Sequence, residues 1–178
     1  AVVALIAVVL WTVPAGIPES GVGATRSDGP RALVVGLDGG TWRVIQPLLD
    51  RAELPTIARM IAEGTSGDLL SYDRSLSSVV WTSIATGKHP SKHGIHDFYG
   101  TSTDVTAARF WEVLTSASEP VGIFQWLVTW PPDPVPGFMV PGWLARDAST
   151  TPDRLRFIKE LELAGQSKRN PGALVLVH

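Results

Sequence analysis

The sequence predicts an α/β fold, because short apolar runs typical of strands alternate with stretches in which apolar residues recur at helical spacing. The run at residues 32–37 lies between Pro30 and the turn sequence Asp38-Gly39-Gly40, and it is typical of a strand buried on both faces of a parallel sheet. A second such run occupies residues 121–124. With 178 residues, 44% of them hydrophobic, the chain is long enough to bury a core of its own.

The elements between these two runs follow from spacing and from helix-breaking residues. Apolar residues recur at helical spacing on both sides of the Leu54-Pro55 break, which predicts two helices, the second closed by Gly64. The next segments are predicted as a strand at 67–72, a helix at about 79–85, a polar loop at 88–104 and a helix at about 106–116.

Three further segments are predicted towards the carboxyl end. Residues 130–141 contain five prolines and are expected to form an irregular loop with a short strand at 138–140. A helix around residues 152–164 leads to an apolar strand at 173–177. We expect the sheet to be incomplete at this end, which would leave an apolar edge strand exposed.

The first 17 residues are expected to form a signal peptide or membrane anchor whose beginning has been lost. Residues 1–13 are apolar except for Thr12, a length that suits a secretory apolar region better than a membrane-spanning helix of about 20 residues. A buried strand or helix is the alternative. Residues 18–30, rich in Gly, Ser and Pro, are predicted to be a flexible linker, and residues 31–178 form the folded part. An exported or membrane-anchored protein is the corresponding localisation.

Composition excludes several classes of function. The formal charge of −2 leaves no basic excess to neutralise a nucleic-acid backbone, so nucleic-acid binding is not expected. Because the sequence has no cysteine, disulfides, thiolate zinc sites and a cysteine nucleophile are all excluded. Any metal ion would be held by oxygen and imidazole ligands.

Two places in the sequence hold candidate metal-binding or catalytic residues: Asp38 at one, and Ser77 with Ser78 at the other. Asp38 follows the predicted strand 32–37, where ligands bind in open α/β sheets, and its carboxylate is a suitable ligand for a divalent metal ion. A turn or helix-capping aspartate is the alternative. Ser77 and Ser78 precede a predicted helix, where a hydroxyl can either cap the helix or lie beside an anion bound at its N-terminus. Spacing alone leaves both readings open.

Four phrases, in this order, resemble the N-terminal part of the type I phosphodiesterase/nucleotide pyrophosphatase family, which belongs to the alkaline phosphatase superfamily. They are ALVVGLDGG, LPTIARMIAEGTSGDL, SLSSVVWTSIATGKHPSKHGIHDF and WPPDPVPGFMVPG, and together they extend from about residue 32 to residue 144. The resemblance implies a doubly wound, mostly parallel α/β sheet and a pair of divalent metal ions, usually zinc. It also implies a Thr or Ser nucleophile that becomes phosphorylated.

The resemblance assigns these roles to individual residues. Asp38 matches the first metal-binding aspartate, and Ser77 matches the nucleophile, which also ligates a metal; Ser78 is the second candidate. Val80 stands where nucleotide pyrophosphatases commonly have an asparagine, so a nucleotide substrate is not implied. The family's remaining ligands, two Asp and three His, have no matching motif after residue 144, so we expect the 178-residue chain by itself to be inactive.

The remaining histidines, aspartates and tryptophans are expected to be structural. His93 is predicted to pack or to make a hydrogen bond, and His89 and His96 to be exposed loop residues. Asp147 and Asp153 are predicted to be loop and helix-capping residues. The tryptophans are expected mainly in the core, although those from Trp126 to Trp143 could line a substrate cleft.

The expected function is therefore metal-dependent hydrolysis of a small phosphodiester or phosphomonoester through a covalent phospho-serine intermediate. Two alternatives stay open. A phosphoethanolamine-type transferase would pass the phosphoryl group to an acceptor other than water. A noncatalytic protein would keep the fold without the activity.

Overall fold

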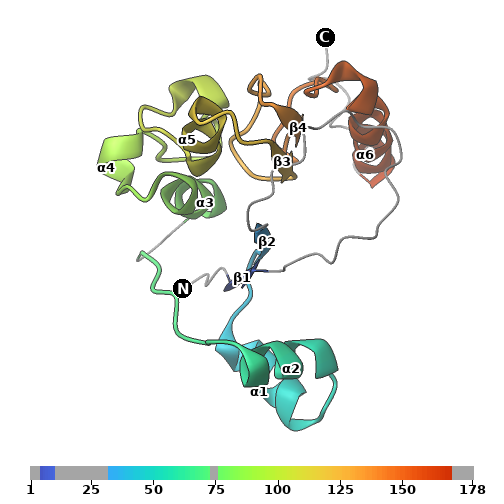
Figure 1. Ribbon diagram of the computed structural model, residues 1–178. Helices are drawn as coiled ribbons and strands as arrows, with labels where there is room; N and C mark the ends of the chain where they lie inside the picture. Colours follow the sequence, from blue (N-terminus) through green and yellow to red (C-terminus); the bar gives the residue numbers. More distant parts are fainter. Residues whose placement is uncertain (1–4, 11–31, 73–75, 170–178) are drawn as a thin grey trace. The chain divides into compact units, whose positions relative to one another are not determined.

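The computed structural model describes residues 5–10, 32–72 and 76–169, which fall in two compact units. The first unit consists of residues 5–10 and 32–72, and the second consists of residues 76–169. Each unit contains its own two-stranded sheet together with helices, which are labelled in Figure 1. The predicted linker at 18–30 and the predicted strand at 173–177 lie outside the described residues.

In the first unit, β1 (Leu5–Leu10) pairs with β2 (Ala32–Leu37) in an antiparallel sheet. The strand predicted at 32–37 is confirmed, but its predicted burial in a parallel sheet is wrong: Leu33 is 58% exposed, and Leu5 lies opposite Leu37 in the antiparallel register. The physical reason is that the apolar segment 5–10 supplies the hydrogen-bonding partner, and a two-stranded sheet covers little of its own surface. The signal peptide or anchor expected over residues 1–17 stays a prediction, since most of that segment is not described. In the ranges that are described, no helix has the length and apolarity needed to cross a membrane.

Two helices follow β2, as predicted from their spacing. Helix α1 (Trp42–Asp50) begins after Thr41, whose hydroxyl accepts the N–H of Arg43 at 3.4 Å. Helix α2 (Pro55–Glu63) has Pro55 in its first turn, where the missing N–H costs nothing, and ends at Gly64. The strand predicted at 67–72 does not form: these residues have no neighbouring strand within the described chain, and Leu70 is 91% exposed.

The second unit contains a small parallel sheet of β3 (Val121–Phe124) and β4 (Gly137–Val140). Both strands occur where the sequence predicts them, with Val121 opposite Gly137. Gly137 has a φ of +154°, and a Cβ atom at this position would collide with the carbonyl oxygen of Val121. Only glycine lets β4 start this close to β3.

Helices surround this sheet. Helix α5 (Phe110–Ser116) packs against β3 and against α3 (Ser77–Thr86), while α6 (Arg156–Arg169) packs against β4 (Figure 1). The predicted helices 79–85 and 106–116 are confirmed, although the second starts at Phe110, and the predicted helix 152–164 extends to Arg169. The polar loop predicted at 88–104 contains the short helix α4 (Pro90–His93) and the 3₁₀ turn η1 (Ser102–Asp104); a second such turn, η2 (Asp153–Leu155), precedes α6.

The core of the second unit is built around Trp111, whose side chain is fully buried. Its buried neighbours are Ala85, Val121, Ile123, Val135 and Met139. The ring of Trp126 lies edge to face with both Trp81 and Trp111, with centroids 5.0 and 5.8 Å apart. These contacts confirm the core positions expected for the three tryptophans. The mixture of helices with a small parallel sheet is compatible with the predicted α/β fold, but the doubly wound sheet is not seen among the described residues.

Candidate active site

Asp38 lies in an exposed turn between β2 and α1. Gly39 adopts a φ of +73°, and the N–H of Gly40 donates to the carbonyl of Leu37, which closes the turn. Because Thr41 caps α1, Asp38 does not serve as the helix cap that the sequence allowed. The carboxylate is therefore presented at the end of a strand, next to two residues without side chains.

Ser77 is the first residue of α3 and is half-buried. The residue before it, Leu76, occupies the cap position and has no side-chain oxygen, so no side chain caps the helix. The N–H groups of the first turn consequently have no acceptor within the helix. A hydroxyl at this position lies beside the N–H groups of the first helical turn and the positive end of the helix dipole, an arrangement that stabilises a bound phosphate.

Ser78 has a different environment from its neighbour. Its side chain is fully buried, and its hydroxyl donates to the carbonyl oxygen of Asp97 at 2.6 Å. This hydrogen bond occupies the hydroxyl proton and fixes the loop after α4 to the start of α3. Of the two candidate nucleophiles, Ser77 is the less buried residue.

The structure does not bring the two predicted metal ligands together in one described body. Asp38 belongs to the first unit and Ser77 to the second. Among the residues that the structure describes, no group of three or more His, Asp or Glu side chains could hold a metal ion. A catalytic zinc ion takes three protein ligands, so the described residues do not form a complete site for the expected metal pair.

His93 is a buried hydrogen-bonding residue. Its Nδ1 accepts the N–H of Ile95 at 3.1 Å, so Nε2 carries the proton and donates to the hydroxyl of Ser83 at 2.9 Å. Burial lowers the pKa of His93, and the neighbouring His96 lowers it further. Both ring nitrogens are therefore already used, in the packing and hydrogen-bonding role that the sequence predicts. His89 and His96 are exposed, as expected.

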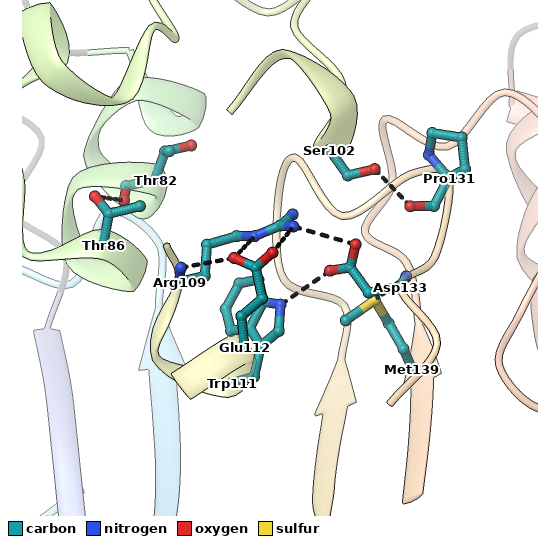
Figure 2. Close-up of polar contacts among 9 residues, drawn as sticks. All are labelled: Thr82, Thr86, Ser102, Arg109, Trp111, Glu112, Pro131, Asp133 and Met139. Carbon is teal, nitrogen blue, oxygen red and sulfur yellow. Dashed lines mark hydrogen bonds and ion pairs between the residues drawn. The ribbon is translucent and has the colours of Figure 1, made fainter. Parts of the chain in front are cut away.

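A charge network around the buried Arg109, shown in Figure 2, joins α5 to the proline-rich loop. The guanidinium of Arg109, 5% exposed, donates to both carboxylate oxygens of Glu112 at 2.9 Å and to Asp133 at 3.1 Å. Burial by itself would lower the pKa of Arg109, but the hydrogen bond with Glu112 and the charge of Asp133 raise it. Asp133 also accepts the indole N–H of Trp111 at 3.0 Å. Sequence analysis missed this network, although Arg109 and Glu112 have the i,i+3 spacing of a helical ion pair.

A cleft of about 100 Å³ lies entirely within the second unit. Residues from three segments line it, at 98–101, 128–130 and 142–146, Trp143 excepted. On its wall, the guanidinium of Arg146 lies over the ring of Trp130, 5.3 Å from the ring centre. The indole N–H of Trp130 donates to Asp147 at 2.8 Å, which places Asp147 in the loop role predicted for it.

The family model described as type I phosphodiesterase/nucleotide pyrophosphatase matches residues 32–135, more than half of the chain. The chain belongs to this family. The matched segment begins with β2 and includes both Asp38 and Ser77 of this type I phosphodiesterase/nucleotide pyrophosphatase family member. The segment 142–146 of the cleft lies outside that match. No curated protein and no solved structure matches the chain.

Membership implies phosphodiester or pyrophosphate hydrolase activity, since the family is generally hydrolytic and usually metal-dependent.

Proposed function

We propose that this protein hydrolyses small phosphodiesters or phosphomonoesters and that Ser77 is its nucleophile. The observation that carries the proposal is the position of Ser77: a half-buried serine on the first residue of a ten-residue helix whose cap residue, Leu76, makes no side-chain hydrogen bond to it. The N–H groups of that turn would hold the phosphoryl oxygens and stabilise the negative charge that develops on them.

The proposed reaction has two displacements. In the first, Oγ of Ser77 attacks phosphorus, the bond to the leaving oxygen breaks, and the proton lost from the hydroxyl ends on the released alcohol. In the second, water attacks the phospho-serine, the phosphorus–Oγ bond breaks, and the hydroxyl of Ser77 regains a proton. Dividing the reaction in this way replaces one difficult step by two easier ones.

Each of the two candidate metal ligands is proposed to hold one coordination position of a divalent metal pair, zinc being the family's usual metal. Asp38 supplies a carboxylate oxygen and Ser77 its Oγ, both oxygen donors that suit divalent ions. The described residues supply fewer ligands than such a pair needs, so the proposal requires further ligands and assigns no step of the reaction to the metal. Export or membrane anchoring, a small-molecule substrate and the absence of nucleic-acid binding belong to the same proposal.

The test is to trap the phospho-enzyme. The natural full-length protein, incubated with zinc and a nitrophenyl phosphate ester and then quenched in acid, should carry one phosphate on the peptide that contains Ser77. Ser77→Ala should lower turnover by at least about 1000-fold, whereas Ser77→Thr should retain the phosphorylated residue. Asp38→Asn should raise the zinc concentration needed for half-maximal activity.

The matched control is Ser116→Ala, which removes an exposed hydroxyl that bonds only to the carbonyl of Val113 in its own helix. This variant should keep full activity. Turnover that survives in Ser77→Ala, or phosphate found on another residue, would contradict the proposed nucleophile.

A further inference from the structure

The cleft lined by residues 98–101, 128–130 and 142–146 is built onto the beginning of α3. The hydroxyl of Ser78 holds the carbonyl of Asp97, and the next residue, Phe98, lines the cleft. On another side, the indole N–H of Trp126 donates to the carbonyl of Trp81 at 3.2 Å. The residues that form the cleft are thus fixed to the helix that starts with Ser77.

The cleft segment 142–146 is hydrogen-bonded to the chain around the segment 128–130. The N–H of Gly142 donates to the carbonyl of Trp126 at 3.1 Å and lies 3.2 Å from the hydroxyl oxygen of Thr129. On the opposite side, the ammonium of the fully buried Lys159 donates to the carbonyl of Gly142 at 3.1 Å. The cleft therefore has walls that are held by hydrogen bonds on each side.

Arg146 is held in a defined position on this wall. Its Nη2 donates to the carbonyl of Tyr99 at 3.1 Å, and its guanidinium lies over Trp130. Trp130 is itself fixed through its indole N–H by Asp147. Arg146 is exposed, but these two contacts favour one position of its side chain, so a ligand that binds it loses less additional side-chain entropy.

The guanidinium has donor capacity left. Arginine carries five N–H donors, and within the described part of the chain Arg146 uses one of them and forms no ion pair. The charge of Arg146 acts on the carboxylate of Asp104, whose Oδ2 accepts both the N–H and the hydroxyl of Thr101, while Asp147 accepts the indole N–H of Trp130. A positive donor group thus lines the cleft, and no carboxylate among the described residues is bonded to it.

The size of the cleft limits what it can hold. Whole-ligand pockets are commonly about 300–1,000 Å³, several times larger than this cleft. A volume of about 100 Å³ instead suits one compact group of a larger molecule.

We propose that this cleft binds a compact oxyanion, a carboxylate or phosphate group carried on the alcohol portion of the ester, and that Arg146 recognises it. The planar guanidinium suits both groups because it can donate two parallel hydrogen bonds to their oxygens. The inference rests on the proposed function and deepens it, since it selects esters whose leaving alcohol carries its own negative charge.

The test measures binding without turnover. The chain with Ser77→Ala is titrated with methyl phosphate and, separately, with acetate, while NMR follows the indole N–H of Trp130 and the Nε–H of Arg146. Both resonances should shift and saturate, and the tighter of the two probes identifies the oxyanion. Arg146→Gln should weaken binding by about tenfold or more, the loss expected for hydrogen bonds to a charged group.

The matched control is Arg154→Gln, which removes the same charge from an exposed position outside the cleft and should leave binding unchanged. Arg146→Lys keeps the charge but not the planar fork of donors and should also bind more weakly. If the indole resonances of Arg146→Gln lose the dispersion of a folded protein, Arg146→Lys replaces it as the test variant. An unchanged affinity in the Arg146 variants, an equal loss in Arg154→Gln, or no saturable shift in the parent would overturn the proposal. Saturable binding without any phospho-Ser77 in the full-length protein would overturn the proposed function alone.

Discussion

The two serines at the start of α3 differ in what their hydroxyls can do. The Ser78 hydroxyl is buried and already donates to Asp97, so moving it to attack a phosphorus atom would break a short hydrogen bond and leave a carbonyl unpaired. The Ser77 hydroxyl lies one residue earlier, where the helix has just begun and the side chain is half-buried. A single step along the chain therefore separates a hydroxyl held in a buried hydrogen bond from the hydroxyl that we propose as the nucleophile.

The buried His93 should make the free energy of unfolding depend on pH. Its lowered pKa means that the folded protein keeps the ring neutral while the unfolded chain binds a proton at the usual value of about 6.5. Because the unfolded state then holds more protons, the free energy of unfolding falls as the pH drops from about 6.5 towards the lowered pKa. Urea unfolding between pH 8 and 5 should show this decrease.

The variant His93→Gln should remove that slope. The glutamine can still donate to Ser83 but cannot reproduce the acceptor that Nδ1 offers to Ile95, so we also expect a loss of about 1–3 kcal/mol at neutral pH. A variant with the same pH slope as the parent would show that another group causes it.

Among the elements, the proline-rich loop is attached to α5 by side chains and not by strand pairing. Asp133 accepts hydrogen bonds from both Arg109 and Trp111, which are almost completely buried. Removing the carboxylate of Asp133 would leave the buried guanidinium of Arg109 without one of its two charged partners. Asp133→Ala should therefore lower the free energy of unfolding by about 3 kcal/mol, measured by urea denaturation.

Asp153→Ala is the control for this variant. Asp153 also pairs with an arginine, at 3.5 Å, but its side chain is 77% exposed, so the unfolding midpoint should hardly move. Equal effects of the two substitutions would mean that the buried network adds nothing beyond an ordinary surface pair.

Local patterns predicted most elements, because helix periodicity and helix-ending residues act over a few positions. Pro55 and Gly64 bound α2, and the apolar runs at 121–124 and 138–140 became β3 and β4. The strand predicted at 67–72 failed because a strand needs a partner, which local sequence does not specify. For the same reason the sequence could not show that residues 5–10 would pair with β2.

Some residues of the candidate site could likewise be predicted from the sequence, and others could not. Asp38 and Ser77 could be found from the sequence because each lies next to its own strand or helix boundary. Arg146 could not, since its contacts with Tyr99 and Trp130 join segments that are far apart in the chain. The orientation of Ser78 towards Asp97 also depends on such a distant contact.

In the whole molecule, burial is unevenly distributed between the two units. Among residues 32–72 and 76–166, whose burial the structure describes, Ile45 is the buried hydrophobic residue of the first unit, whereas the second unit contains all the others, from Val79 to Ala148. Because regions with few buried apolar contacts open more easily, the first unit should have the lower local stability.

Hydrogen exchange followed by mass spectrometry tests this difference. Backbone amides of α1 and α2 should exchange with solvent at least about tenfold faster than those of α3 and α5 at the same pH, since buried helices open less often. Equal protection in the four helices would contradict an uneven distribution of stability.

The edge-to-face contacts of Trp126 with Trp81 and Trp111 have a spectroscopic consequence. Indole rings this close and this steeply inclined, with interplanar angles of 82° and 70°, couple their electronic transitions. The resulting circular dichroism arises from the second unit and disappears when the three rings separate. The protein therefore contains its own optical reporter for the folding of the unit that holds Ser77.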